Sequence, residues 1–294
     1  MASFWSEMAG NRTRTWLLFA FFFALLFAVA YFFGWYTGMG SFGIAFAAIV
    51  AVLLTVGGYY YSDKIVLATT GARPANKQEH QYLVNVVEGL SLAAGIPQPR
   101  IYVIDDDSIN AFATGRDPQH AVVCVTTGAL KKLNREQLEG VVAHEISHVK
   151  NEDIKVMMLA AVFAGCIIIL SDMLIRVRLF GGGGNDRGGR GGAIFMVVGF
   201  LLVILAPIFA QVIRLAVSRS REYLADASGA QLTRYPEGLA SALDRISKDA
   251  APMRNASNAT AHLFISNPFK AKMMGSLFST HPPLDDRIKR LRAM

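Results

Sequence analysis

The chain has 294 residues, of which 53% are hydrophobic and 17% are charged, and it carries a formal net charge of +7 at pH 7. No nucleic-acid-binding motif accompanies this positive charge, so membrane orientation and anionic lipid explain it better than a nucleic-acid partner. The two cysteines, Cys124 and Cys166, lie in a predicted strand and in a predicted membrane helix, so we expect no disulfide between them.

The first predicted elements are two membrane spans that form a hairpin over residues 1–62. No charged residue occurs from Thr15 to Ser62, and this run is far longer than the roughly 20 apolar residues that cross a bilayer. Glycines between residues 34 and 43 divide it into spans at Trp16–Tyr36 and Phe42–Tyr61. A cleaved signal peptide would have a shorter apolar core, and a second span would not follow at once. We therefore expect a membrane anchor.

Two strands are predicted after the hairpin, at Arg100–Ile104 and Ala121–Thr127, because both segments are rich in residues that favour strands. Between them, Ile109–Thr114 is compatible with an edge strand whose backbone N–H and C=O groups can pair with an extended peptide. A simple surface hairpin is the alternative. The candidate peptide-binding residues in this segment are Asn110, Ala111, Phe112 and Ala113.

The next segment, His144-Glu145-Ile146-Ser147-His148, combines two histidines at metal-ligand spacing with a carboxylate. Residues four apart lie on one face of a helix, so both imidazoles can reach one metal ion. Glu145 lies beside the first histidine, where it can polarise a metal-bound water. The pattern predicts a catalytic zinc site, and a buried helix with two incidental histidines is the alternative.

Two further apolar segments follow, Val156–Ile175 and Ala193–Ile213, joined by a glycine-rich connector at Gly181–Gly192. Their length and their lack of amphipathic alternation favour helices that span the membrane or are embedded in it. Long buried helices of a soluble domain are the alternative. Two full crossings would place an arginine-rich connector outside, against the positive-inside rule, so the sequence leaves open whether both segments cross completely.

A third metal ligand is predicted after the last apolar segment. A catalytic zinc usually takes three protein ligands and a water. Glu222 and Asp226 are four residues apart on a predicted helix, so one carboxylate can bind the metal while the other accepts a hydrogen bond from a ligand imidazole. A solvated helix face, with Arg219 and Arg221 as ion-pair partners, is the alternative.

A shared metal ion also constrains the topology. If His144, His148 and Glu222 bind one ion, they lie on one side of the membrane, and the intervening chain crosses it an even number of times. Basic residues flank the predicted spans on that side. By the positive-inside rule, the metal site is therefore expected to face the cytoplasm.

At these motifs the chain resembles the HtpX family, bacterial membrane zinc metalloproteases that are related to the CAAX prenyl proteases. The resemblance covers nearly the whole length. It rests on the early hairpin, the glycine-rich connector and four motifs in the expected order, which are Asn110–Gly115, Ala143–His148, Ser218–Asp226 and Thr280–Leu284.

Together with the apolar runs, the resemblance implies a mainly α membrane protein with a small β-sheet. A gluzincin-like zinc metalloprotease domain is then built on about four transmembrane or membrane-embedded helices. The expected parts are the hairpin (1–62), a first part of the protease domain (63–155), an apolar helix pair (156–214) and a second part of the protease domain (215–294).

The resemblance also assigns roles to individual residues. It makes His144, His148 and Glu222 the ligands of one Zn²⁺ per chain, and Glu145 the catalytic base. Asp226 resembles the carboxylate that supports a ligand. His281, in a turn before two prolines, resembles a histidine that stabilises the oxyanion, although a lone histidine is more often an ordinary surface residue.

The implied function is cleavage of misfolded or surplus membrane proteins in the bacterial inner membrane, as part of protein quality control and the stress response. Protein substrates and the lipid bilayer are the expected partners, and the oligomeric state is not predicted. Two alternatives stay open. A CAAX-type prenyl-protein endopeptidase would need a lipid-sized chamber, for which four apolar segments are few. A non-enzymatic scaffold with structural zinc would normally have four protein ligands.

Overall fold

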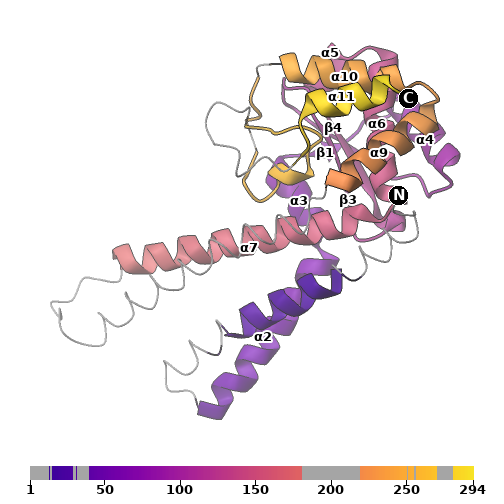
Figure 1. Cartoon of the computed structure of the whole chain (residues 1–294). Helices are drawn as coiled ribbons and strands as arrows, with labels where there is room; N and C mark the ends of the chain where they lie inside the picture. Colours follow the sequence, from indigo (N-terminus) through magenta and orange to yellow (C-terminus); the bar gives the residue numbers. More distant parts are fainter. Residues whose placement is uncertain are drawn as a thin grey trace.

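The computed structural model describes residues 13, 15–28, 31, 40–180, 219–249, 251–254, 256–269 and 281–294. Within these residues, a globular part contains the sheet and most of the helices, and a stem of long helices extends away from it (Figure 1). The predicted connector Gly181–Gly192 and the predicted segment Ala193–Ile213 lie outside the described residues.

The stem consists of the helix Thr15–Ala28, helix α2 (Gly40–Tyr60) and helix α7 (Asp153–Phe180). An apolar cluster joins these helices, and at its centre Phe22 stacks on Phe163 with ring centroids 3.8 Å apart. Among the described residues, α2 is the one helix long and apolar enough to cross a membrane, and Thr15–Ala28 is a shorter apolar helix. The predicted segment Val156–Ile175 is helical and lies within α7.

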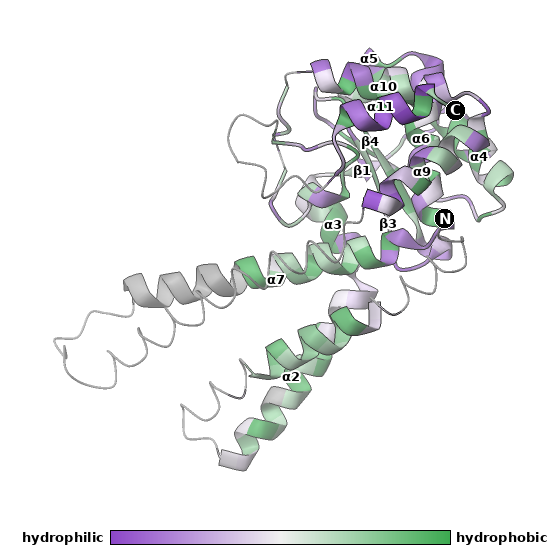
Figure 2. Cartoon of the chain, viewed as in Figure 1, coloured by the Kyte–Doolittle hydropathy of each residue, from purple (hydrophilic) through white to green (hydrophobic). Residues whose placement is uncertain are grey.

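Hydrophobic residues predominate along the coloured parts of the stem helices (Figure 2). On α2, Phe42 and Leu53 are 66% and 65% exposed, and several other large apolar side chains of this helix are also exposed. A contiguous apolar surface of this kind is typical of a face that contacts lipid or another protein.

The sheet has four strands, which are β1 (Arg73–Pro74), β2 (Arg100–Ile104), β3 (Ala111–Thr114) and β4 (Val122–Thr126). Their order is β1-β2-β4-β3, in which β2 and β4 are parallel and the two outer pairings are antiparallel. The two predicted strands are therefore confirmed as β2 and β4.

The predicted edge strand is β3, and it lies at the edge of the sheet. Its backbone groups are only partly free, which corrects the expectation of an open edge. The carbonyl oxygen of Ala111 accepts a hydrogen bond of 2.9 Å from the N–H of Ile265. A segment far along the chain therefore covers the first residue of this edge.

The remaining helices surround the sheet. They are α3 (Ser62–Thr70), α4 (Gln81–Ala94), α5 (Thr127–Lys132), α6 (Arg135–Lys150), α9 (Arg219–Thr233), α10 (Pro236–Lys248) and α11 (Leu284–Arg292), with short 3₁₀ turns η1 (Pro118–His120) and η2 (Ala261–Leu263). Helix α6 lies at the centre, in contact with α4, α9, α10 and β3.

A capping box determines where α6 begins. The side chain of Asn134 accepts a hydrogen bond of 2.8 Å from the N–H of Gln137, and the Gln137 side chain accepts one of 3.0 Å from the N–H of Asn134. This arrangement satisfies two N–H groups at the start of the helix. The start of α6 is therefore determined locally.

Glycines allow the neighbouring helices to approach α6 closely. A Cβ atom on Gly140 would lie 2.5 Å from the backbone nitrogen of Leu239 in α10. A Cβ atom on Gly229 in α9 would lie 3.0 Å from the backbone nitrogen of His144. A side chain at either position would push apart two helices that are in direct backbone contact.

We expect Gly140→Ala to lower the free energy of unfolding by about 1–3 kcal/mol, because the added methyl group meets backbone that cannot move independently. Thermal unfolding of the purified protein in detergent measures the change. Gly89→Ala is the matched control, since Gly89 is an exposed position of α4 with no atom within 4 Å of its Cβ position. The control should gain roughly 0.5–1 kcal/mol from the better helix former. Equal stability of Gly140→Ala and the wild type would contradict the close packing of α6 and α10.

Candidate metal centre

Helix α6 places His144, Glu145 and His148 in the interior of the globular part. All three are at least 96% buried, with exposed fractions of 1%, 2% and 4%. The two histidines lie one turn apart, and their Nε2 atoms are 3.2 Å from each other. Both imidazoles therefore point toward the same small volume, as the spacing in the sequence predicts.

Helix α9 brings Glu222 to these two imidazoles. Its Oε2 atom lies 3.8 Å from Nε2 of His144, and its Oε1 atom lies 3.7 Å from Nε2 of His148. One ligand atom from each residue falls within 4.8 Å of the other two. The structure thus brings the three predicted ligands together, although Glu222 is more than 70 residues away in the sequence.

One atom of this cluster shows that it suits a cation. Oε2 of Glu222 is buried and accepts no hydrogen bond from any described residue. A buried carboxylate oxygen without a donor is costly, and a metal ion at the meeting point of the three side chains would satisfy it. Two imidazole nitrogens and one carboxylate oxygen are a donor set that zinc accepts.

Two further carboxylates orient the imidazoles. Oδ1 of Asp226 lies 3.0 Å from Nδ1 of His144, and Oδ2 of Asp153 lies 3.1 Å from Nδ1 of His148. Each carboxylate favours a proton on Nδ1 and leaves Nε2 available as a ligand atom. Asp226 was predicted for such a position. Asp153 was not predicted to support a ligand. Acidic residues are common in the first turn of helices, so its place at the start of α7 gives no sign of this role.

Arg287 of α11 is a second residue that the prediction missed. From its sequence neighbours it belongs to a basic block with Lys289, Arg290 and Arg292, but the structure buries it completely. Its guanidinium donates two hydrogen bonds to Asp226, of 2.8 and 2.7 Å. Leu284, Arg287, Ile288 and Leu291 have the spacing of one helix face. An arginine on an otherwise apolar face is the signal that identifies it.

Burial and charge set the pKa values of the two central carboxyl groups in the metal-free protein. Burial raises the pKa of Glu145 to about 7, against the lowering effect of a charge on His148. Burial also acts to raise the pKa of Glu222, but the positive charges of His281, His148 and Arg287 outweigh it and bring the pKa down to about 2. Glu222 is thus an anion at neutral pH, while Glu145 exchanges a proton readily.

The pKa values of the two imidazoles also differ from each other. Burial lowers the pKa of His144 to about 4. Burial acts in the same direction on His148, but its hydrogen bond to Asp153 and the charge of Glu222 outweigh it and raise the pKa to about 9. His148 is therefore protonated at neutral pH in the metal-free protein, and an incoming metal ion has to displace that proton.

Two of the other predicted residues, His281 and Ala113, adjoin this centre. Nε2 of His281, just before α11, is 3.7 Å from Oε2 of Glu222. The backbone of Ala113 in β3 forms a hydrogen bond with Glu145. Phe112 is buried, with its ring 5.1 Å from that of Phe264.

Asn110 holds another part of the same chain. Its carboxamide donates a hydrogen bond of 3.1 Å to the carbonyl of Ser266 and accepts one of 3.3 Å from the N–H of Ser266. Of the four predicted peptide-binding residues, Ala113 is therefore the one whose backbone adjoins the metal centre.

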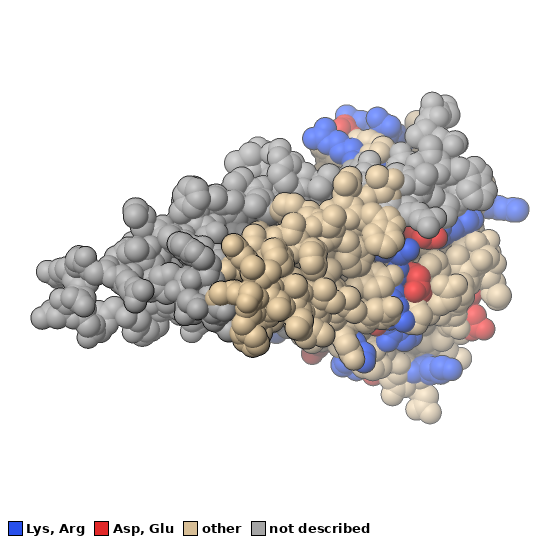
Figure 3. Space-filling view, turned by 90° about the horizontal axis from the view of Figure 1, so that it is seen from below, with Lys and Arg blue, Asp and Glu red and all other residues tan. Residues whose placement is uncertain are grey.

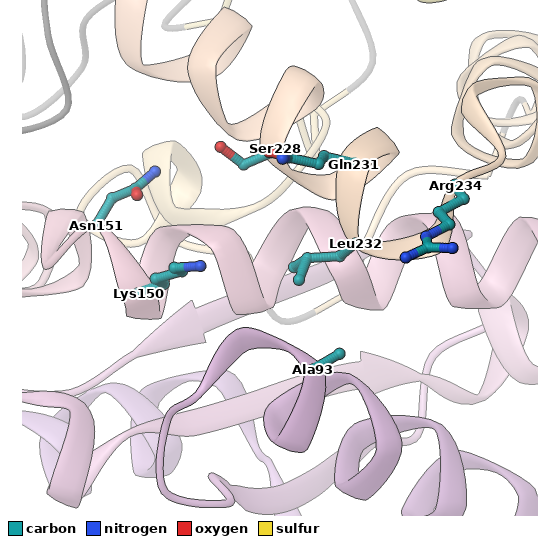
Figure 4. A pocket seen from close by; sticks show the side chains of 7 residues that line it. All are labelled: Ala93, Lys150, Asn151, Ser228, Gln231, Leu232 and Arg234. Atoms are coloured by element: carbon teal, nitrogen blue, oxygen red, sulfur yellow. The ribbon is translucent and has the colours of Figure 1, made fainter.

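A separate cleft of about 600 Å³ opens at the end of α6, and none of the predicted site residues lines it (Figure 4). Its lining residues are Ala93, Lys150, Asn151, Ser228, Gln231, Leu232 and Arg234. The metal centre is thus an interior site, distinct from this opening.

Comparison with known proteins relates the chain to peptidases. Residues 77–294 match the family described as Peptidase family M48. A protein named Protease HtpX homolog from Thermoanaerobacter pseudethanolicus is 50% identical over 289 residues, which cover 97% of this chain and 96% of that protein. A protein of the same name from Pyrococcus furiosus is 47% identical over 285 residues, which cover 96% of each chain.

A solved structure resembles the fold. The crystal structure of S. mikatae Ste24p superposes with a TM-score of 0.53 at 19% sequence identity, and the match covers 99% of this chain and 66% of that one. At this identity the likeness concerns the fold alone.

The charge state of His148 predicts how metal binding depends on pH. Because a pKa of about 9 means that a proton leaves His148 for each ion bound, we expect the apparent metal affinity to rise by about tenfold per pH unit between about pH 6 and pH 8. Competition with a chelator, corrected for its own protonation, measures this slope. Asp153→Asn should flatten it, because the pKa of His148 falls when its carboxylate partner is removed. An affinity that does not change with pH would refute this account of His148.

Proposed function

This chain belongs to peptidase family M48 and is a metallopeptidase, and on that premise we propose that it is a zinc endopeptidase integrated in the bacterial inner membrane. Its proposed substrates are misfolded or surplus membrane proteins, which places it in protein quality control and the stress response. The observation that carries the proposal is the convergence of His144, His148 and Glu222 beside the buried carboxyl group of Glu145.

The proposed metal is zinc, one ion per chain, held by His144, His148 and Glu222. Three protein ligands are typical of catalytic zinc sites, whereas structural sites usually have four. When bound, the ion would supply a Lewis acid that polarises the substrate carbonyl and lowers the pKa of a water molecule.

The chain's own residues move the protons. Glu145 accepts a proton from the attacking water and later delivers it to the amine that leaves when the C–N bond breaks. Its pKa of about 7 in the metal-free protein suits a group that both takes up and releases a proton near neutral pH. His281, at the edge of the same cluster, is proposed to donate a hydrogen bond to the oxyanion that forms on the carbonyl carbon.

Substrate pairing was predicted along Asn110 to Ala113, but Ser266 and Ile265 of the same chain already occupy Asn110 and Ala111. The substrate is therefore proposed to bind as an extended strand at the Ala113 end of β3. The backbone of Ala113 adjoins Glu145, so a peptide paired with this end of the strand would have its scissile bond close to the base. Backbone pairing reads little of the side-chain sequence. This suits an enzyme that acts on many unfolded proteins.

The stem supports a membrane location for the enzyme. Lys and Arg side chains lie on the globular part near the root of the apolar stem (Figure 3). Two basic residues lie against tyrosines at the end of α2: Lys64 lies 5.2 Å from the ring centre of Tyr61, and Arg116 lies 5.5 Å from that of Tyr60. Tyrosine is enriched at both membrane interfaces, and Lys and Arg are enriched on the cytoplasmic side. We propose that the metal centre faces the cytoplasm.

The main alternative is a prenyl-protein endopeptidase with the same metal centre. The fold likeness to Ste24p is compatible with it, but this chain spans only 66% of that protein's length. Cleavage of a membrane-protein reporter without a prenyl group supports the general endopeptidase. Cleavage confined to prenylated peptides supports the alternative.

The role of Glu145 predicts the result of one substitution. Glu145→Gln should keep the bound zinc and the thermal stability but lose about 10²- to 10⁴-fold in hydrolysis, because the amide cannot accept the proton. Cleavage of casein or of a membrane reporter, with and without a chelator, measures the loss. Glu139→Gln is the matched control in the same helix, since Glu139 accepts a hydrogen bond of 3.0 Å from Tyr82 and is not part of the centre. Full activity of Glu145→Gln would remove Glu145 from the mechanism.

The proposed topology predicts where inserted tags are found. A tag after residue 294 and a tag within residues 80–90 should report the same compartment, the cytoplasm, because α4 and α11 belong to the same globular part. Compartment-specific labelling of intact cells measures this. Labelling of the two tags from opposite sides of the membrane would contradict the proposal that both parts of the metal centre lie in the same compartment.

A further inference from the structure

Arg287 occupies the interior of the globular part, and its side chain is completely buried. A buried charge is costly unless its hydrogen-bonding groups are paired. The contacts that pair this guanidinium join parts of the molecule that are distant in sequence.

The first set of contacts is with the metal centre. Nε and Nη2 of Arg287 donate to the two oxygens of Asp226, at 2.8 and 2.7 Å. The same carboxylate lies 3.0 Å from Nδ1 of His144. Nη1 of Arg287 also lies 3.6 Å from Oε2 of Glu222. Nη2 of Arg287 also lies 3.4 Å from both ring nitrogens of His144. The guanidinium thus fixes the carboxylate that supports His144 and lies directly beside His144 and Glu222.

The second contact is with the segment Leu263–Ser266, which we call the brace. Nη1 of Arg287 donates a hydrogen bond of 3.3 Å to the carbonyl of Ile265. The N–H of Ile265 donates in turn to the carbonyl of Ala111 in β3, at 2.9 Å. The brace is anchored further where the rings of Phe264 and Phe112 meet. One guanidinium therefore contacts both the metal centre and the brace, which lies along β3, the proposed substrate-binding strand.

We propose that Arg287 is a positioning residue that couples the metal centre to β3, the proposed substrate-binding strand. It holds Asp226, and through it His144, at a fixed place while it holds the brace along β3. The inference rests on the proposed function of the metal centre and adds a residue that sets the position of the ligands relative to the strand.

The geometry requires arginine at this position. Three different nitrogens of the planar guanidinium make the contacts with Asp226 and Ile265. Lysine keeps the positive charge but offers a single nitrogen, which cannot reproduce these contacts together. Arg287→Lys therefore separates the effect of geometry from the effect of charge.

The test compares full-length Arg287→Lys with the wild type in detergent, using zinc itself as the ligand. Two quantities are measured: the zinc affinity by chelator competition, and the hydrogen exchange of residues 263–266 by mass spectrometry. We expect about 10- to 100-fold weaker zinc binding, the range typical when a group that supports a metal ligand is changed. We also expect faster exchange of the brace.

The matched control is Arg292→Lys in the same helix. Arg292 also contacts a carboxylate through two nitrogens, both 3.1 Å from Glu237, but this pair is exposed. An exposed pair contributes little, so zinc affinity and brace exchange should both stay at their wild-type values.

Two results would overturn the inference. They are a wild-type zinc affinity in Arg287→Lys and an unchanged exchange of the brace. A wild-type protein that binds no zinc would instead refute the metal site itself, and with it the proposed function.

Discussion

The structure depends on one electrostatic constraint, the burial of several carboxylates close together in the interior. Glu145, Glu222 and Asp226 are each 2% exposed, and burial acts to raise the pKa of all three. Only a concentration of positive charge can keep Glu222 and Asp226 ionised there. Arg287 supplies part of that charge within the chain, and the oxygen of Glu222 that accepts no hydrogen bond from a described residue marks where a metal ion would supply the rest.

Helix packing converts this constraint into a defined site. The candidate ligands come from α6 and α9, and the distance between these helices decides whether Glu222 reaches the two imidazoles. Gly229 permits that distance, because a side chain there would meet the backbone of His144. The lack of a side chain at Gly229 is therefore as important for the centre as the carboxylates that α9 carries.

The metal centre and the stem share one helix. Helix α7 begins with Asp153, which supports His148, and continues into the apolar cluster around Phe163. Near its start, the carbonyl of Met157 lies 2.9 Å from a ring nitrogen of His262, just ahead of the brace. Helix α7 therefore contacts the candidate metal centre, the segment beside β3 and the apolar cluster of the stem.

The sequence by itself determined that His144 and His148 share a face, because a spacing of four on a helix places both side chains on one side whatever surrounds them. Local strand preference also determined β2 and β4, while it left the strand between them as one of two possibilities. Only the tertiary structure decided that Asp153 supports His148, that Ile265 covers Ala111 and that Arg287 is buried against Asp226. Local periodicity fixes which side chains share a face of one element. Which faces of different elements meet depends on helix packing and on hydrogen bonds between segments far apart in the chain, and no local pattern contains that information.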